Sequence, residues 1–361
     1  MNNNDPYLLA LNAHPKIGSQ TIKKILAVAP DLSKLWNKGE GLIGKRLEPK
    51  VVDLVKDVIA NFDPESELMK IKSQDLGYLT YFDSGYPVQL KEIYDAPIVL
   101  YIRGSIDALG YPSVAIVGSR KCTYYGRRVA RQFSKELAGA GLAIVSGLAL
   151  GVDGEAHIGA LEGEGITVGV LGCGIDQIYP SSHTRIASEI IAKGGAVISE
   201  FPPGTPAYKQ NFPARNRIIA GLSLGTLVVE AAEGSGSLIT AICALEYGRE
   251  IFAIPGNIEQ ENSRGTNKLI QQGAKLVLSP DEILSELRIR NIKSTKKAKK
   301  ILPESEEETQ ILHELSQKPC LVDEIVEKTG YNIIAINSTL TMMEMKGMIE
   351  NTGGGRYRKI C

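Results

Sequence analysis

The sequence predicts an α/β fold: a Rossmann-like, doubly wound and mostly parallel sheet, with a small N-terminal helical domain and a C-terminal winged-helix module. Two observations predict the sheet. Between residues 113 and about 287, short β-branched runs alternate with amphipathic helical patterns, as parallel strands joined by helices do. Glycine-rich turns follow most of these runs, which is typical of a buried strand leading into a helix N-terminus.

The expected strands of this sheet are residues 114–117, 142–145, 167–171, 196–199, 226–230, 251–254 and 275–278. Two further pieces, at residues 77–81 and 96–101, indicate an edge of the sheet. Ligands of doubly wound sheets bind at the carboxyl ends of the strands. The polar and glycine-rich loops after these runs therefore predict one elongated site along a single rim.

The two ends of the chain have helical patterns of their own. Residues 1–65 predict a helical domain of helix-hairpin-helix or SAM-like type, and residues 66–287 an extended Rossmann-like domain. The turn around His14 and Gly18 is open to two interpretations, a contact with a nucleic-acid backbone or simple helix packing. Residues 288–302 contain seven basic residues and no acid, which predicts a basic linker.

Residues 303–361 predict a winged helix, because three helical patterns precede a hairpin. The third helix pattern, at residues 333–346, is poor in Arg and Lys, so it lacks the usual features of a helix that reads the major groove. Arg356, Arg358 and Lys359 keep DNA binding open for the wing. A role in protein interaction or packing has at least equal weight.

Composition excludes several classes of protein. The 41 basic residues balance the 41 acidic ones, so a polyanionic partner must be met by a local patch. No run of about 18 apolar residues is present, and the first residues have no signal-peptide pattern. The five cysteines are scattered and never form a CxxC pair, which indicates reduced thiols in a cytoplasmic protein.

The first strand of the alternating region ends at Gly118, Ser119 and Arg120. Backbone N–H groups at such a turn favour an anion, and Arg120 adds a fixed positive charge. A denser motif follows the second strand, where Asp153 and His157 lie four residues apart. Two such residues without a third are poor evidence for a metal, so we expect a capping Asp, a hydrogen-bonded His, and no metal or cofactor.

Residues 209–217 place three cations, one aromatic ring and three amides close together. Cations neutralise phosphates, and an aromatic ring stacks on an unpaired base. We therefore expect Lys209 and Phe212 to contact a ligand, with Asn211 and Arg215 beside them. Arg217 is expected to form internal ion pairs.

The last motif joins Glu230 to a glycine turn and a helix start, with Gly234, Ser235, Gly236 and Ser237 as an anion-binding nest. It lacks the Lys-Ser/Thr ending of a P-loop, and the chain has no G-x-G-x-x-G after its first strand. No nucleophile stands beside a base. The sequence therefore indicates neither an ATPase nor an NAD enzyme, and no catalytic residue is predicted.

Together these motifs resemble those of one bacterial family, the DNA-processing protein A family (DprA, also called Smf). The matching residues are Tyr86-Pro87, Leu90, Ile93, Asp95, Pro97, Leu100-Tyr101 and Gly104; Val117 to Arg120; Ser146-Gly147, Ala149, Gly151, Asp153 and Ala156-His157; Phe212-Pro213 and Arg215 to Ile219; Glu230-Ala231, Gly234 to Leu238 and Thr240-Ala241; and Pro255-Gly256 and Gly265 to Asn267. The resemblance covers about residues 77–287.

The resemblance implies a homodimeric single-stranded-DNA-binding protein, without catalysis, that protects incoming DNA and helps load the RecA recombinase in natural transformation. It assigns Arg120, Lys209 and Phe212 to DNA contact, with Gly118 and Ser119 shaping the pocket. One alternative comes from related Rossmann-like folds: a nucleoside-monophosphate phosphoribohydrolase-like enzyme, in which Glu230 and the nest at residues 234–237 hold the phosphate. The cluster at residues 209–217 favours the DNA-binding interpretation, since a small-nucleotide enzyme does not need it.

Overall fold

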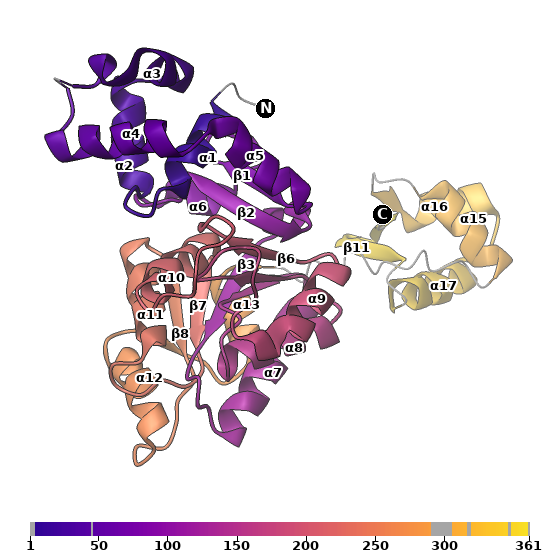
Figure 1. Cartoon of the computed structure of the whole chain (residues 1–361). Helices are drawn as coiled ribbons and strands as arrows, with labels where there is room; N and C mark the ends of the chain where they lie inside the picture. Colours follow the sequence, from indigo (N-terminus) through magenta and orange to yellow (C-terminus); the bar gives the residue numbers. More distant parts are fainter. Residues whose placement is uncertain (1–3, 45, 290–304, 316–318, 346–347, 360–361) are drawn as a thin grey trace. The chain divides into compact units, whose positions relative to one another are not determined.

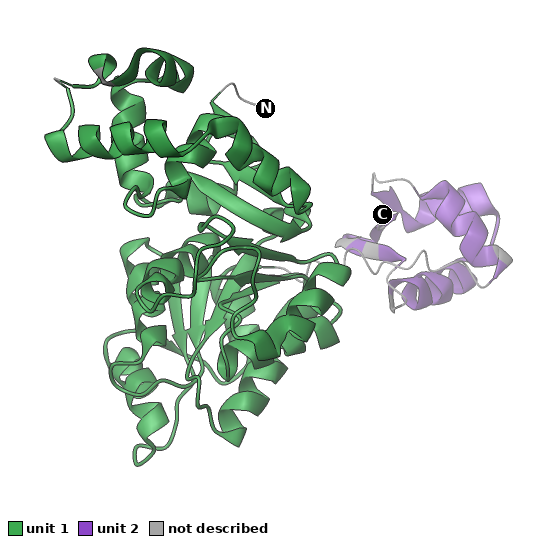
Figure 2. Ribbon diagram, in the orientation of Figure 1, with its two compact units in different colours: residues 1–290 green, residues 291–361 purple. Residues whose placement is uncertain are grey.

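The computed structural model describes residues 4–44, 46–289, 305–315, 319–345 and 348–359. The chain forms two compact units, residues 1–290 and 291–361 (Figure 2). Most of the predicted basic linker lies outside the described residues.

The first unit is built on a nine-stranded sheet with the order β1-β2-β6-β5-β4-β3-β7-β8-β9 (Figure 1). Its strands are β1 (Gly77–Thr80), β2 (Val99–Gly104), β3 (Ser113–Val117), β4 (Ala143–Ser146), β5 (Thr167–Val170), β6 (Ala196–Ser199), β7 (Gly225–Val228), β8 (Glu250–Ala253) and β9 (Lys275–Leu276). The strands from β3 to β9 pair in parallel, and β1 and β2 join antiparallel beside β6. This topology confirms the predicted Rossmann-like fold.

Helices cover both faces of the sheet: α6 (Val88–Glu92), α7 (Tyr124–Gly139), α8 (Val152–Glu162), α9 (Thr184–Ala192), α10 (Asn211–Leu222), α11 (Gly236–Glu246), α12 (Glu261–Gln271) and α13 (Pro280–Glu286). Every residue of β3 is buried, and alternate side chains serve opposite faces. Val114 and Ile116 share a core with α7 and α8, whereas Ala115 and Val117 share one with α10 and α11. Burial on both faces explains why the central strands are continuous apolar runs.

Five helices precede the sheet: α1 (Asp5–Ala13), α2 (Ser19–Val28), α3 (Leu32–Lys38), α4 (Pro49–Asn61) and α5 (Pro64–Ser73). Their apolar core continues into β2. The turn between α1 and α2 contains His14, whose Nε2 lies 2.9 Å from Asp57 Oδ2.

Residues at the start of α2 form hydrogen bonds with the segment that leads into β2. The Ile98 N–H donates to Ser19 Oγ, and the side chains of Gln20 and Lys23 donate to the Tyr94 carbonyl. In this structure, the helical hairpin therefore contacts the chain's own segment from Tyr94 to Ile98.

The second unit has the predicted winged-helix arrangement. It consists of α15 (Glu306–Glu314), α16 (Val322–Thr329) and α17 (Ile333–Met345), and a sheet of the order β10-β12-β11. The strands are β10 (Cys320–Leu321), β11 (Ile349–Gly353) and β12 (Arg356–Lys359). Ile311, Ile325, Ile336 and Leu340 fill its core, so the helical periodicity of the sequence is explained by packing.

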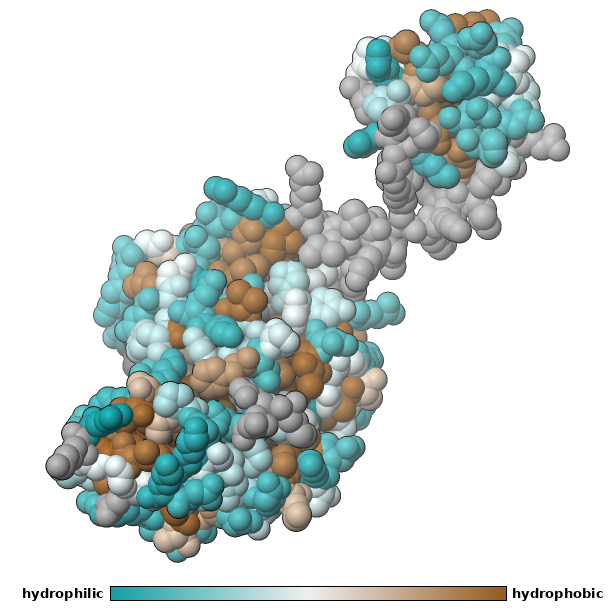
Figure 3. Space-filling model, turned by 90° about the horizontal axis from the view of Figure 1, so that it is seen from above, coloured by the Kyte–Doolittle hydropathy of each residue, from teal (hydrophilic) through white to brown (hydrophobic). Residues whose placement is uncertain are grey.

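Hydrophilic and hydrophobic residues alternate in small patches over the face seen in Figure 3. Within the described residues, no helix is both long and apolar enough to cross a membrane. The four cysteines in the described ranges are free thiols.

Candidate functional site

A groove of about 910 Å³ lies at the carboxyl ends of the central strands, bordered by the starts of α10 and α11. Nine of the eleven residues predicted to bind the ligand line it: Gly118, Ser119, Arg120, Lys209, Phe212, Arg215, Ser235, Gly236 and Ser237. The other two, Asn211 and Gly234, do not. The sheet thus brings together motifs that are more than a hundred residues apart in the chain.

The turn after β3 is fixed by close backbone contacts. A Cβ atom on Gly118 would lie 2.7 Å from Val152 Cγ2, so only glycine fits. Ser119 N–H donates to the Glu230 carbonyl at 2.7 Å, and Val152 N–H donates to the Ser119 carbonyl. The exposed Arg120 is therefore projected from a rigid turn, with its guanidinium carbon 5.2 Å from the Phe212 ring centroid.

The sequence analysis predicts that N–H groups at the turn after β3 bind an external anion, but at the N-terminus of α7 a carboxylate of the chain itself takes that place. The Glu230 carboxylate accepts hydrogen bonds from the Thr123 backbone N–H at 2.8 Å and from the Thr123 hydroxyl at 2.6 Å. A Cβ on Gly126 would lie 2.5 Å from the same carboxylate. The chain's own anion therefore fills the place that a phosphate would take, and Glu230 is engaged structurally rather than free to act on a nucleotide.

The start of α10 presents its predicted residues in three different ways. Lys209 is exposed just before the helix, and Phe212 is half-buried against Gly172. Asn211 points inward: it is buried, and its side-chain nitrogen has no hydrogen-bond partner. Lys209 and Phe212 therefore form part of the groove wall, whereas Asn211 belongs to the packing beneath it.

Arg215 is buried under the groove and bonded to backbone. Its Nη1 donates to the carbonyls of Gly147, at 2.8 Å, and Val170. Asp153 Oδ2 accepts the Gly147 N–H at 3.1 Å. Burial lowers the pKa of Arg215 to about 10, and the nearby Asp153 carboxylate opposes that shift, so the guanidinium is charged at neutral pH.

Arg217, as expected, faces away from the groove into internal ion pairs. Its guanidinium lies 2.6 Å from Glu200 Oε2 and 3.4 Å from Asp95 Oδ2. Burial raises the pKa of Glu200, while the Arg217 charge opposes this effect. These contacts tie α10 to β6 and to the segment after α6, which holds Phe212 and Arg215 at the groove.

The N-terminus of α11 is open toward the groove. Gly234 has a φ of +77°, and a Cβ at Gly234 or Gly236 would meet no atom within 4 Å. The Ser235 and Ser237 hydroxyls lie 2.8 Å apart, and Asn216 Nδ2 donates to the Gly236 carbonyl. Backbone N–H groups and hydroxyls at a helix start suit a phosphate.

The groove also contains residues that the sequence analysis did not select. Tyr179, in the loop after β5, lies beside Phe212 with ring centroids 5.5 Å apart. Lys121, Asn216, Glu261 and Asn262 are among the other polar residues of its lining. The glycine-rich residues 172–174 indicate that the loop after β5 borders the groove. No local sequence pattern predicts that Tyr179, further along the same loop, reaches the groove lining.

Asp153 and His157 have separate hydrogen-bond partners, Gly147 and Thr167. The Thr167 hydroxyl donates to the Ile144 carbonyl and therefore accepts from His157 Nδ1 at 2.7 Å, which leaves the buried Nε2 without a partner. In the described part of the chain, no three His, Cys, Asp or Glu side chains are grouped to hold a metal ion.

Fold and site together define a class: a Rossmann-like protein with an open cationic groove, whose usual dinucleotide position is filled by its own carboxylate. The profile of the family "DNA recombination-mediator protein A" matches residues 77–288, and the DprA winged helix domain matches residues 295–355. The chain belongs to this family of DNA-processing proteins, DprA or Smf.

Relatives and solved structures agree with this assignment. Protein Smf of Escherichia coli is 42% identical over 288 residues, covering 76% of each chain. The DNA processing protein DprA of Bacillus subtilis is 42% identical over 67% of this chain and 82% of its own length. The Streptococcus pneumoniae DprA structure superposes with a TM-score of 0.68 at 38% identity, covering 79% of this chain and 98% of that one.

The structure of DNA processing protein A from Helicobacter pylori, described for its single-stranded DNA binding mode, superposes with a TM-score of 0.53. It is 32% identical and covers 59% of this chain and 95% of its own.

Proposed function

We propose that this chain binds single-stranded DNA through the groove, with little dependence on sequence and without catalysis. In natural transformation or recombination it would protect incoming strands in the cytoplasm and help to load the RecA recombinase, acting as a homodimer. The observation that carries the proposal is the convergence of Arg120, Lys209, the Phe212 ring and the α11 N-terminus in one groove.

Each of these features suits a flexible unpaired strand. Arg120 and Lys209 are exposed cations that neutralise phosphates, and the open start of α11 offers N–H donors to another. The Phe212 ring stacks on any base, because every base has a π face. A duplex keeps its bases paired and stacked inside, so it cannot use the ring.

The family relationship supports the wider role. The Helicobacter pylori relative is described as binding single-stranded DNA, and the family is named for mediating recombination. The RecA and homodimer partnerships, and the division of the first unit into residues 1–65 and 66–287, stay predictions.

Fluorescence anisotropy with labelled oligonucleotides tests the central claim. We expect the full chain to bind an unpaired strand more tightly than a duplex of the same length. Affinity should fall as salt rises, because phosphate contacts release counterions. Equal or tighter binding of the duplex would contradict the use of the ring.

A further inference from the structure

The start of α7 carries a basic surface with an exposed aromatic ring, and it lies outside the contacts proposed above. The first two turns of the helix expose Tyr124, Arg127 and Arg128, and Lys121 is exposed just before them. Residues three and four apart are neighbours on a helix surface, so both arginines lie one turn from the Tyr124 ring. We call Lys121, Tyr124, Arg127 and Arg128 the α7 face.

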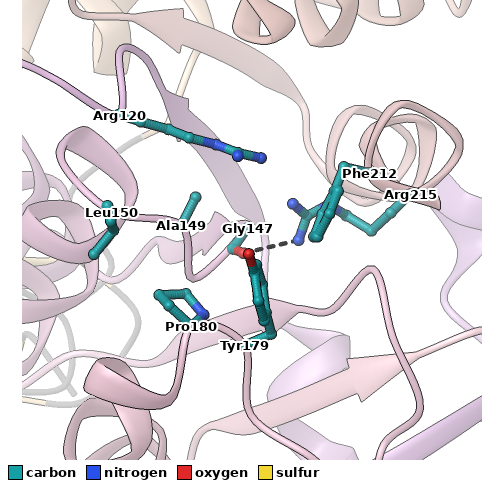
Figure 4. Close-up of a pocket in the computed structure, with 8 residues that line it drawn as sticks. All are labelled: Arg120, Gly147, Ala149, Leu150, Tyr179, Pro180, Phe212 and Arg215. Carbon is teal, nitrogen blue, oxygen red and sulfur yellow. Dashed lines mark hydrogen bonds between the residues drawn. The ribbon is translucent and has the colours of Figure 1, made fainter. Parts of the chain in front are cut away.

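The α7 face is continuous with the groove, because Lys121 belongs to both surfaces. The residue before it, Arg120, points across the groove toward Phe212 (Figure 4). The Lys121 carbonyl accepts a hydrogen bond from Asn262 Nδ2 at 2.9 Å, which fixes the turn between the two surfaces. A strand that leaves the groove past Arg120 therefore meets the α7 face next.

The positive charge of this face is not neutralised within the described part of the chain. Neither Arg127 nor Arg128 has an acidic side chain within ion-pair distance there. The acidic residues of α8 that lie against α7 pair instead with Arg131, one turn further along. The Glu230 carboxylate is buried and bonded to Thr123. The two arginines are therefore available to an external anion.

Tyr124 gives the face a ring as well as charge. It is 82% exposed, and no described residue provides its side chain with a ring contact or a hydrogen bond. The adjacent Tyr125 differs, since its hydroxyl donates to the Pro255 carbonyl at 3.3 Å. An exposed ring between cations is the arrangement on which unpaired bases stack in single-strand binding proteins.

We propose that the α7 face is a second contact surface for single-stranded DNA, which takes the part of the strand that leaves the groove. Arg127 and Arg128 neutralise phosphates, and Tyr124 stacks on one base, so the contact depends little on sequence. The inference rests on the proposed binding in the groove and lengthens the strand that one chain covers. An acidic protein segment would satisfy the arginines but would not require the ring.

Strands of two lengths test the α7 face on the full chain, about 5 and about 20 nucleotides, because only the longer one extends beyond the groove. Arg127→Ala combined with Arg128→Ala should bind the short strand like the parent and the long strand about tenfold more weakly. The slope of log K against log salt should fall by about 1.4 for the long strand, or about 0.7 per phosphate. Arg185→Ala with Lys193→Ala removes the same charge from α9 and should change neither strand.

The ring is tested separately. Tyr124→Ala should weaken the long strand about fivefold, the lower end of the range for one base stack, and leave the short strand unchanged. Tyr111, 41% exposed before the amino end of β3, is the control, and Tyr111→Ala should bind both strands normally. Tyr124→Trp retains a ring, and the long strand alone should quench its fluorescence. The parent chain, with Trp36 as its one tryptophan, provides the background.

The outcomes separate this inference from the proposed function. If neither strand binds the parent chain, single-strand binding itself is wrong and the inference falls with it. If the double arginine variant loses both strands equally, its effect is not confined to the extended part of the strand, and the inference is overturned. If it matches the parent on both strands, the face serves another anionic partner, such as an acidic protein segment, which also overturns the inference.

Discussion

The groove of the first unit and the third helix of the winged helix are both surfaces on which nucleic acid binds in many folds, yet they differ in chemistry. The groove combines Arg120, Lys209 and Phe212 with an open helix start. Helix α17 contains no Lys or Arg, and it exposes Ile334 and Met342. Residues 303–361 contain ten acidic and six basic residues. Fold alone does not assign a nucleic-acid surface; the side chains do.

The largest expected difference between the two units is their response to acid. Burial lowers the pKa of His157 to about 3 from its ordinary 6.5. Below pH 6.5 the unfolded chain therefore binds a proton that the folded first unit excludes. Its free energy of unfolding should fall toward acid, by about 1.4 kcal/mol per pH unit at most for this group, between pH 6.5 and 3.

Urea unfolding of the full chain between pH 7 and 5 measures this effect. His157→Gln has no titrating group and should flatten the dependence of the first unit. An unchanged pH slope in the variant would show that His157 is not responsible.

The second largest effect is expected from removing the Phe212 ring. Phe212→Ala should cost about 1–3 kcal/mol of single-strand binding, because one base loses its stacking partner. Anisotropy with a labelled strand measures the loss. Phe82, 47% exposed after β1, provides the control, and Phe82→Ala should bind normally. Full affinity in Phe212→Ala would move the strand elsewhere, for example to the basic residues 288–300.

A smaller effect follows from removing one phosphate contact. Arg120→Ala should lower affinity and reduce the slope of log K against log salt by about one. The comparison variant is Arg185→Ala, which removes an exposed arginine of α9 outside the groove lining. A salt slope equal to that of the parent would exclude a phosphate contact by Arg120.

The smallest effect is expected on the wing. Arg358→Ala combined with Lys359→Ala should change single-strand affinity by less than about twofold, within the range of nonspecific surface charge. The same labelled strand serves as the probe. A loss as large as that of Phe212→Ala would remove the contrast between the two units.

Much of the fold could be predicted because its determinants are local. Burial on both faces of the sheet explains the apolar runs of the central strands, and the parallel order brought nine predicted residues to one edge. What could not be predicted depends on distant partners. Glu230 bonds to a residue 107 positions away, Asn211 turns inward at its helix start, and Tyr179 is placed by a long loop.

The bond between Glu230 and Thr123 also bears on competition inside a cell. Coenzymes and nucleoside phosphates are abundant small anions, and sheets of this class attract their pyrophosphate to the first helix after the glycine turn. Here a resident carboxylate already occupies those donors and repels a second negative charge. The N-terminus of α7 is therefore closed to such small anions, although it follows the glycine turn at which this class of sheet usually holds them.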